Sequence, residues 1–483
     1  MTSGIDGFST ATEMLAALDR RDVSSAELTD MQIERIERLD GKINAVVVRD
    51  FAAARERAVV ADARRAAGEP LGKLDGLPHT LKESTAAAGL PQTAAMPAFA
   101  GHIAEADGPV AAKVRAAGGV LLGKTNIAPF LADIQSNNTT YGRSLNPWNP
   151  ARTPGGSTGG GGAAVAAGLS PLEFGSDIGG SIRIPALFCG IYGHRPSETV
   201  VSRSGAIPVS QRPNVTAVMG VQGPLARSAE DIELALDVIS GPEAGEDTAW
   251  KLELPRARHE RLADMRVAVL PAIDWCPVDN EILESQDRLA SALGRLGAKV
   301  ATAGPAFDMR DHHKDYLRVL SSRILARMPA GEREATAKTM MASDDEFTRA
   351  NGEGANASAV AYFELMDRRE QYREAYRAFF REWDILLAPT TIFPAIEHND
   401  LPLGQRVASI NGEEVPFSLF LVYSGIVTLA GQPSLAFPTG LTRSGLPIGL
   451  QAIGPYLEDR TPIRFGQLVA KEIGGYRRPP GFE

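Results

Sequence analysis

A run of glycines in the first half of the chain constrains the fold more than any other feature. Six glycines occupy the eight positions from Gly155 to Gly162, and the small residues of 163–168 follow directly. A flexible linker would continue into polar sequence, whereas small apolar residues favour a helix packed closely against its neighbours. A phosphate-binding P-loop needs a lysine after the glycines, and this run has none. We therefore expect a tightly packed turn and helix here.

The same run contains the G-x-S-x-G pattern of a nucleophile elbow, which would make Ser157 the nucleophile of an esterase. That elbow must follow a buried strand. The residues before Ser157 include Pro147, Pro150 and Pro154, and a central strand does not accommodate them. The esterase hypothesis is kept as an alternative, although its structural context is missing.

A second glycine-flanked serine, Ser181, follows 181 − 157 = 24 residues later. The apolar residues 172–174 lead into its loop. The small residues before it would let four backbone N–H groups converge on one point. Such a group of donors stabilises a developing oxyanion. The predicted donors are the amides of Ile178, Gly179, Gly180 and Ser181.

Strands and helices alternate along much of the chain. Short apolar runs at 120–123, 265–270, 298–302 and 384–389 predict strands, and the segments 52–67, 280–296 and 355–383 predict helices. This alternation favours an α/β fold with a mixed, twisted β-sheet covered by helices on both faces. We expect one domain over residues 1–483, with a helical insertion or cap at about 305–383.

Two kinds of local signal mark particular boundaries. Thr10 with Glu13, and Ser24 with Glu27, each fit the capping box that begins a helix. The residues 410–413 contain Asn-Gly, which predicts a hairpin with a type I′ turn.

Charge and cysteine content exclude several classes of protein. Lys plus Arg minus Asp plus Glu is 50 − 59 = −9, and the acidic balance argues against nucleic acid as a partner. The two cysteines, Cys189 and Cys276, lie far apart and predict neither a disulfide scaffold nor a thiolate zinc site. The uncharged stretch 415–442 is interrupted by prolines, so it predicts no membrane span. With no signal peptide at the start, we expect a soluble cytoplasmic protein.

The residues from Pro154 to Ser197 resemble the signature of the amidase signature family, whose members hydrolyse amides through a Ser–Ser–Lys triad. Similar motifs follow in family order at 74–84, 89–93, 123–126, 141–148, 431–434 and 446–451. The resemblance covers roughly residues 10 to 470 and implies the amidase signature fold. It also implies hydrolysis without a cofactor or a metal.

Carried over position by position, the resemblance makes Ser181 the acylated nucleophile, Ser157 the bridging serine on a cis peptide, and Lys82 the base. Lysine acts as a base only when neutral, so burial must lower the pKa of Lys82 from its usual value near 10.4. Asp177 and Arg183 would brace the loop as a pair. The sequence departs from the family at Thr158, where a second serine is usual, and at 194–195, where Leu-Lys is replaced by His-Arg.

The substrate is predicted less directly. By the same resemblance, Leu131, Asp133 and Gln135 fall where family members line the acyl pocket, and the uncharged segment 417–429 would add apolar walls through Phe420 and Tyr423. These residues favour a neutral, partly aromatic amide, anilide or carbamate (urethane), a small molecule. Self-association into a homodimer stays open.

Two alternatives belong to other functional classes. One is the glutaminase-like subunit of a tRNA-dependent amidotransferase; the acidic charge and the residues after Asn126 argue against it. The other is a catalytically silent binding protein of the same fold. That hypothesis predicts the loss of a triad residue, and none is lost.

Overall fold

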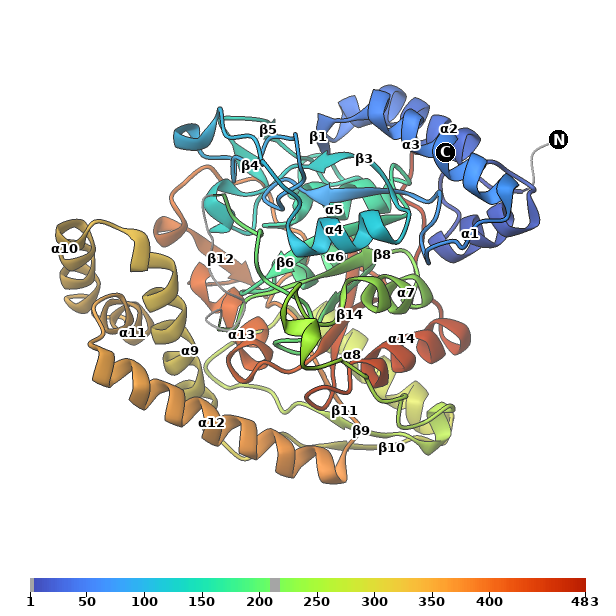
Figure 1. Ribbon diagram of the computed structural model, residues 1–483. Coiled ribbons are helices and arrows are strands. Elements are labelled where there is room, and N and C mark those ends of the chain that lie inside the picture. The colour runs from blue at the N-terminus through green and yellow to red at the C-terminus, as the bar shows by residue number, and fades with distance from the viewer. Residues whose placement is uncertain (1–3, 209–217) are drawn as a thin grey trace.

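The computed structural model describes residues 4–208 and 218–483. Its centre is a mixed sheet of eleven strands in the order β1-β3-β2-β6-β8-β7-β14-β15-β11-β9-β10 (Figure 1). The strands of this sheet are β1 Val46–Arg49, β2 Pro78–Lys82, β3 Val120–Thr125, β6 Leu172–Asp177, β7 Tyr192–Arg195, β8 Val221–Ala226, β9 Arg266–Val269, β10 Lys299–Thr302, β11 Ile385–Ala388, β14 Ser434–Leu441 and β15 Pro447–Ile453. Two small antiparallel pairs lie outside it, β4 Asn137–Asn138 with β5 Gly142–Arg143, and β12 Val407–Ile410 with β13 Glu413–Pro416.

Helices surround the sheet, as predicted for an α/β fold. Their bounds are α1 Ala11–Arg20, α2 Ser25–Leu39, α3 Phe51–Ala67, α4 Pro109–Ala116, α5 Gly159–Ala166, α6 Arg183–Cys189, α7 Ala229–Ile239, α8 Asn280–Arg295, α9 Met309–Ile324, α10 Ala330–Met341, α11 Glu346–Ala355, α12 Ala359–Glu382, α13 Leu421–Ala430 and α14 Arg460–Glu472. The four helices α9 to α12 follow one another between β10 and β11, and Figure 1 shows them along one side of the molecule.

Strand β3 shows why both faces of the sheet are buried. Successive side chains of a strand point to opposite faces. Val120 and Leu122 join one hydrophobic cluster with residues of α2, α3 and α5, whereas Leu121 joins a second cluster with residues of α4 and α7. All six residues of β3 are buried. A strand with helices on each side is apolar at consecutive positions, and this explains its apolar run in the sequence.

The glycine run is a packed helix, as predicted, and not a linker. All eight residues of α5 are buried. A Cβ atom on Gly160 would lie 2.4 Å from the backbone nitrogen of Asn126, and one on Gly161 would lie 2.5 Å from Cγ of Glu173. Only glycine lets α5 approach the strands this closely.

Local signals predicted several boundaries correctly. Thr10 and Ser24 form complete capping boxes with Glu13 and Glu27 at the starts of α1 and α2. Asn411 and Gly412 join β12 to β13 with φ of 54° and 90°, the positive values that a type I′ turn requires.

The predicted helix 355–383 needs a correction. Ala355 ends α11, and Ser358 begins α12 by accepting a hydrogen bond from the amide of Ala361. The long charged and aromatic helix therefore begins at Ala359, four residues later than predicted. Within the described residues, no helix has both the length and the apolar character needed to cross a membrane.

Candidate active site

Strand pairing brings two distant segments to one edge of the sheet. Strand β2 ends at Lys82 and runs parallel to β6, with Thr80 opposite Glu173 and Leu81 opposite Phe174. Parallel neighbours end at the same edge, so Lys82 lies beside Ser176 and Asp177 at the end of β6. The loop before α5 approaches the same edge and places Ser157 there.

Lys82 is fully buried and surrounded by oxygen atoms. Its Nζ lies 2.8 Å from Oγ of Ser157 and 2.8 Å from Oγ1 of Thr158. It also lies 3.1 Å from Oγ and 3.4 Å from the carbonyl oxygen of Ser176. Lys82 is therefore not the surface lysine that a position after a turn would suggest.

Burial lowers the pKa of Lys82 to about 7. The negative charges of Asp177 and Glu173 act in the opposite direction, so desolvation of the ammonium is the dominant cause. Glu173 is itself fully buried, and burial raises its pKa to about 7. A substantial fraction of Lys82 can thus be neutral near pH 7.

Ser157 and Ser181 line one cavity with a volume of about 130 Å³. The peptide bond between Gly156 and Ser157 is cis, the conformation that the resemblance implied. The amide of Thr158 donates to the carbonyl oxygen of Ser181 at 3.2 Å, which ties the two serine loops together. The residues 144–156, all of them described, contain no strand apart from a single bridge at Arg152. The strand that the esterase elbow requires is therefore absent from this stretch.

The loop before Ser181 is organised by Asp177. Its carboxylate accepts hydrogen bonds from the amides of Gly180 at 2.9 Å and Ile182 at 3.1 Å. Gly180 has a φ of +97°, and a Cβ atom there would lie 2.7 Å from Ile184 Cδ1, so the turn needs glycine. The predicted set of oxyanion donors is corrected at one position, because the Gly180 amide is bound to Asp177. Ile178, Gly179 and Ser181 remain the predicted donors.

Arg183 is fully buried and joins this loop to the rest of the sheet. It forms two hydrogen bonds of 3.0 Å with the Asp177 carboxylate. Its Nη1 donates to Gln451 at 2.9 Å, and Gln451 also accepts from Ser434 at 2.9 Å. Residues of the motifs at 431–434 and 446–451 therefore hold Arg183 in place, and Arg183 in turn binds Asp177 in the loop of Ser181.

The predicted pocket residues do not all reach the cavity. Of Leu131, Asp133 and Gln135, Leu131 alone is among the described residues that line it. Asp133 forms two hydrogen bonds of 2.7 Å with Arg406, and Gln135 is bound to the backbone of Asn399. Both side chains hold the segment 129–138 against the segment that precedes β12.

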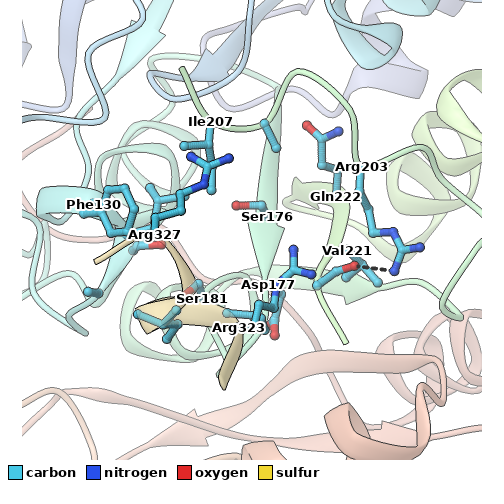
Figure 2. Close-up of a pocket in the computed structure, with 17 residues that line it drawn as sticks. Phe130, Ser176, Asp177, Ser181, Arg203, Ile207, Val221, Gln222, Arg323 and Arg327 are labelled. Atoms are coloured by element: carbon cyan, nitrogen blue, oxygen red, sulfur yellow. Dashed lines mark hydrogen bonds between the residues drawn. The ribbon is translucent and has the colours of Figure 1, made fainter. Parts of the chain in front are cut away.

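The uncharged segment 417–429 also lies elsewhere. Phe420 and Tyr423 are buried in the core, and no residue of this segment is among the described residues of the cavity wall. The wall instead has apolar residues from other segments together with three arginines (Figure 2). Its members include Phe130, Leu131, Ile178, Ile207, Val221, Gln222, Arg203, Arg323 and Arg327.

Sequence reasoning missed two groups of residues at this site. Ser176 and Thr158 contact Lys82, and their places beside the two glycine-flanked serines were a usable signal. The arginines were not predictable in this way, because Arg323 and Arg327 come from α9 and the turn after it, far from every motif.

The comparisons with known proteins agree with this geometry. Residues 27–462 match the profile of the Amidase family. The chain is 30% identical to an indoleacetamide hydrolase of Bradyrhizobium diazoefficiens, over 93% of this chain and 84% of that protein. It is 33% identical to one of the subunits of glutamyl-tRNA(Gln) amidotransferase from Acidothermus cellulolyticus, over 95% of this chain and 93% of that protein.

A solved bacterial aryl acylamidase of the amidase signature enzymes has the same fold. It superposes with a TM-score of 0.79 at 26% identity, over 96% of each chain. The profile match covers most of the chain, and the site at the end of β2 contains the lysine and both serines of the family motif. The chain therefore belongs to the amidase signature family, whose members are hydrolases that act on the C–N bonds of amides.

Proposed function

We propose that this protein hydrolyses small amides through an acyl-enzyme on Ser181, with Ser157 as the bridging hydroxyl and Lys82 as the base. One observation carries the proposal: the fully buried Lys82 amine, with its pKa lowered to about 7, lies 2.8 Å from Oγ of Ser157, and Ser157 and Ser181 line the same cavity. A serine hydroxyl becomes an effective nucleophile only when a base removes its proton.

In the acylation step, the Ser181 hydroxyl attacks the carbonyl carbon of the amide. Its proton passes to Ser157, while the Ser157 proton passes to the neutral Lys82 amine. The amides of Ile178, Gly179 and Ser181 donate to the resulting oxyanion. The proton on Lys82 then returns through Ser157 to the leaving nitrogen, and the C–N bond breaks.

Deacylation uses the same route. A water molecule gives its proton through Ser157 to Lys82 and attacks the ester carbonyl. The second tetrahedral intermediate collapses, the proton returns to Ser181, and the carboxylic acid leaves. A carbamate would react in the same way: the amine leaves during acylation, and the alkyl hydrogen carbonate that water then releases from Ser181 would lose carbon dioxide to give the alcohol.

The size of the cavity and the names of the relatives support a small, partly aromatic amide, such as an anilide. A closed cavity of about 150 Å³ is large enough to bind benzene, and the cavity beside Ser181 is of similar size. Two similar proteins are named for indoleacetamide hydrolysis and aryl acylamidase activity. The wall formed by Phe130, Leu131 and Ile207 is suited to an aryl group.

The test is covalent labelling with phenylmethylsulfonyl fluoride, followed by intact-mass and peptide mapping. We expect one label, on Ser181, and a large loss of labelling in Lys82→Met. The matched control is Lys124→Met. Lys124 is also fully buried, and burial lowers its pKa to about 8, but its Nζ donates to the Pro91 carbonyl. A label on Ser157 would instead support the esterase alternative.

The amidotransferase alternative is favoured by the similarity to glutamyl-tRNA(Gln) amidotransferase subunits. It predicts that the protein needs partner subunits and charged tRNA. We expect the purified chain alone to release aniline from acetanilide, measured by liquid chromatography. Activity on glutamine that appears only with added partner subunits would overturn the proposed function.

A further inference from the structure

Tyr316 contacts the loop of Ser181 from outside the sequence motifs. It lies on α9 and is fully buried. Its hydroxyl donates a hydrogen bond of 3.0 Å to the carbonyl oxygen of Ile178, 138 residues away in the chain. A Cβ atom on Gly179 would lie 3.2 Å from the same hydroxyl oxygen. The Tyr316 hydroxyl therefore lies directly against the peptide unit that joins Ile178 to Gly179.

This peptide unit carries one of the predicted oxyanion donors. The one cis peptide bond among the described residues joins Gly156 to Ser157, so the bond between Ile178 and Gly179 is trans. In a trans peptide the C=O and N–H bonds lie in one plane and point in opposite directions. A hydrogen bond that fixes the Ile178 carbonyl therefore also fixes the direction of the Gly179 N–H, which points away from Tyr316.

The next amide of the loop is held by a different contact. The Gly180 amide donates to the Asp177 carboxylate at 2.9 Å. Among the hydrogen bonds within the described part of the chain, the Gly179 amide has no acceptor. Gly179 lies two residues before Ser181, and Asp177 and Ser181 both line the cavity (Figure 2). The Gly179 amide is thus available for a ligand at the nucleophile.

The ring of Tyr316 is itself closely packed. A Cβ atom on Gly425 would lie 2.8 Å from Cδ1 of the ring, so the absence of a side chain at this position of α13 lets the ring approach the helix backbone. The centre of the His313 ring lies 6.0 Å from that of Tyr316, with 29° between the two planes. Burial raises the pKa of the Tyr316 phenol above its usual value, so the hydroxyl stays a donor at neutral pH. Packing therefore holds the hydroxyl in place before a substrate arrives.

We infer that Tyr316 is a positioning residue for the proposed hydrolysis: its hydroxyl holds the peptide unit between Ile178 and Gly179 so that the Gly179 amide points towards the oxyanion of the tetrahedral intermediate. The inference rests on the proposed function of Ser181. Donors that are aligned before the reaction stabilise the developing charge without having to reorganise during it. A helix that carries none of the sequence motifs would then contribute to the rate without touching the substrate.

The test compares Tyr316→Phe with the matched control Tyr376→Phe. Tyr376 on α12 is also fully buried, and its hydroxyl donates a hydrogen bond of 3.0 Å to the Ile426 carbonyl. Each variant removes one buried hydroxyl from one backbone carbonyl, so both should lower the urea midpoint of unfolding by similar amounts. Only Tyr316→Phe should lower kcat for acetanilide, by about 10- to 100-fold, because a misaligned oxyanion donor loses part of its effect. KM should change little, since the ground-state amide carries no oxyanion.

A second measurement reports on the oxyanion itself. Trifluoroacetophenone is a ketone that should add the Ser181 hydroxyl and form a tetrahedral adduct with a negatively charged oxygen. Tyr316→Phe should raise the inhibition constant of this ketone by the same factor by which it lowers kcat/KM, whereas Tyr376→Phe should leave it unchanged. Gly425→Ala keeps the hydroxyl but displaces the ring, so it should also weaken inhibition by the ketone.

The outcomes separate the two proposals. If Tyr316→Phe and Tyr376→Phe have equal kcat values, Tyr316 is a core tyrosine and the inference is wrong, while the proposed function stands. If Tyr316→Phe loses kcat but binds the ketone as tightly as the wild type does, its effect does not arise at the oxyanion, and the inference is again wrong. If the wild type neither hydrolyses acetanilide nor is labelled at Ser181 by phenylmethylsulfonyl fluoride, the proposed function itself fails.

Discussion

In the proposed mechanism, the protonation state of Lys82 decides whether this residue can act as the base. Burial lowers its pKa to about 7, and only the neutral amine accepts a proton from Ser157. The neutral fraction therefore rises almost tenfold per unit of pH well below 7 and levels off above about 8.

We expect kcat/KM for an anilide to follow this rise, with activity lost as the pH falls through about 7. The measurement is a profile from pH 5.5 to 9. Lys82→Met should lower kcat/KM by a factor of at least about 10² to 10⁴, the usual contribution of a general base. It should also remove the acidic limb of the profile, which is the fall in kcat/KM as the pH drops below about 7. A wild-type profile that stays level between pH 5.5 and 7.5 would contradict the assignment of Lys82 as the base.

Glu173 is a buried acid on the neighbouring strand, β6, and its charge affects the pKa of Lys82. Its Oε1 accepts a hydrogen bond of 2.8 Å from Thr125, and its charge raises the pKa of Lys82. Glu173→Gln keeps an acceptor and removes the charge, so the pKa of Lys82 should fall further and the acidic limb should move to lower pH.

The same pH profile measures this shift. Asp231→Asn is the matched control, because Asp231 is also buried with a raised pKa but binds the first amides of α1. Its acidic limb should coincide with that of the wild type. If the acidic limb of the Glu173→Gln profile moves to higher pH, or does not move, then the charge of Glu173 does not raise the pKa of Lys82.

Among the elements, helix α5 depends most directly on the absence of side chains. A Cβ atom on Gly161 would lie 2.5 Å from Cγ of Glu173, which belongs to β6. Gly161→Ala should therefore force α5 away from the sheet and lower the free energy of unfolding by about 1–3 kcal/mol, as overpacking does. Because Ser157 lies just before α5, activity should fall as well.

Urea unfolding followed by circular dichroism measures the change. The control is Gly294→Ala in α8, where a Cβ atom would meet nothing within 4 Å. That substitution should raise the free energy of unfolding by up to about 1 kcal/mol through helix propensity. Equal effects of the two substitutions would mean that close packing of α5 is not the reason for its glycines.

The elements also explain which local predictions succeeded. The capping boxes at Thr10 and Ser24 and the Asn-Gly turn at 411–412 depend on hydrogen bonds and dihedral angles within a few residues. The start of the predicted helix 355–383 was placed four residues too early, because the Ser358 cap that starts α12 at Ala359 is a single weak signal.

At the scale of the whole molecule, the burial of Lys82 on folding makes the free energy of unfolding depend on pH. The unfolded chain has a lysine pKa near 10.5 and the native protein one near 7. Between these values the unfolded state binds a proton that the native state does not, so this residue makes the free energy of unfolding increase with pH. Below about pH 7 both states are protonated and this dependence disappears.

We expect the free energy of unfolding of the wild type, relative to Lys82→Met, to increase by up to about 1.4 kcal/mol per pH unit between pH 7.5 and 9.5. Urea unfolding of both proteins at three pH values in this range measures the difference. Groups that do not interact with Lys82 titrate alike in both proteins and cancel in the comparison. A difference that is constant with pH would contradict a depressed pKa at this position.

Helix α9 contacts the loop of Ser181 and the cavity wall, although it lies far from the motifs along the chain. Tyr316 on α9 is fully buried and donates a hydrogen bond of 3.0 Å to the carbonyl of Ile178, in the loop before Ser181. The end of the same helix supplies Arg323 to the cavity wall. The segment at about 305–383 was predicted as a helical insertion or cap within one domain, and its action as a cap stays a prediction.

The sequence by itself indicated the candidate residues of the site. Lys82, Ser157, Ser181 and the Asp177–Arg183 pair lie in short motifs that resemble those of the amidase signature family, so they could be singled out without knowing the rest of the fold. The tertiary structure alone decided what surrounds them. It placed Asp133 against Arg406 and Gln135 against Asn399, and it brought arginines from α9 and the turn after it to the cavity. Such contacts depend on long-range packing of strands and helices, which leaves no local pattern in the chain.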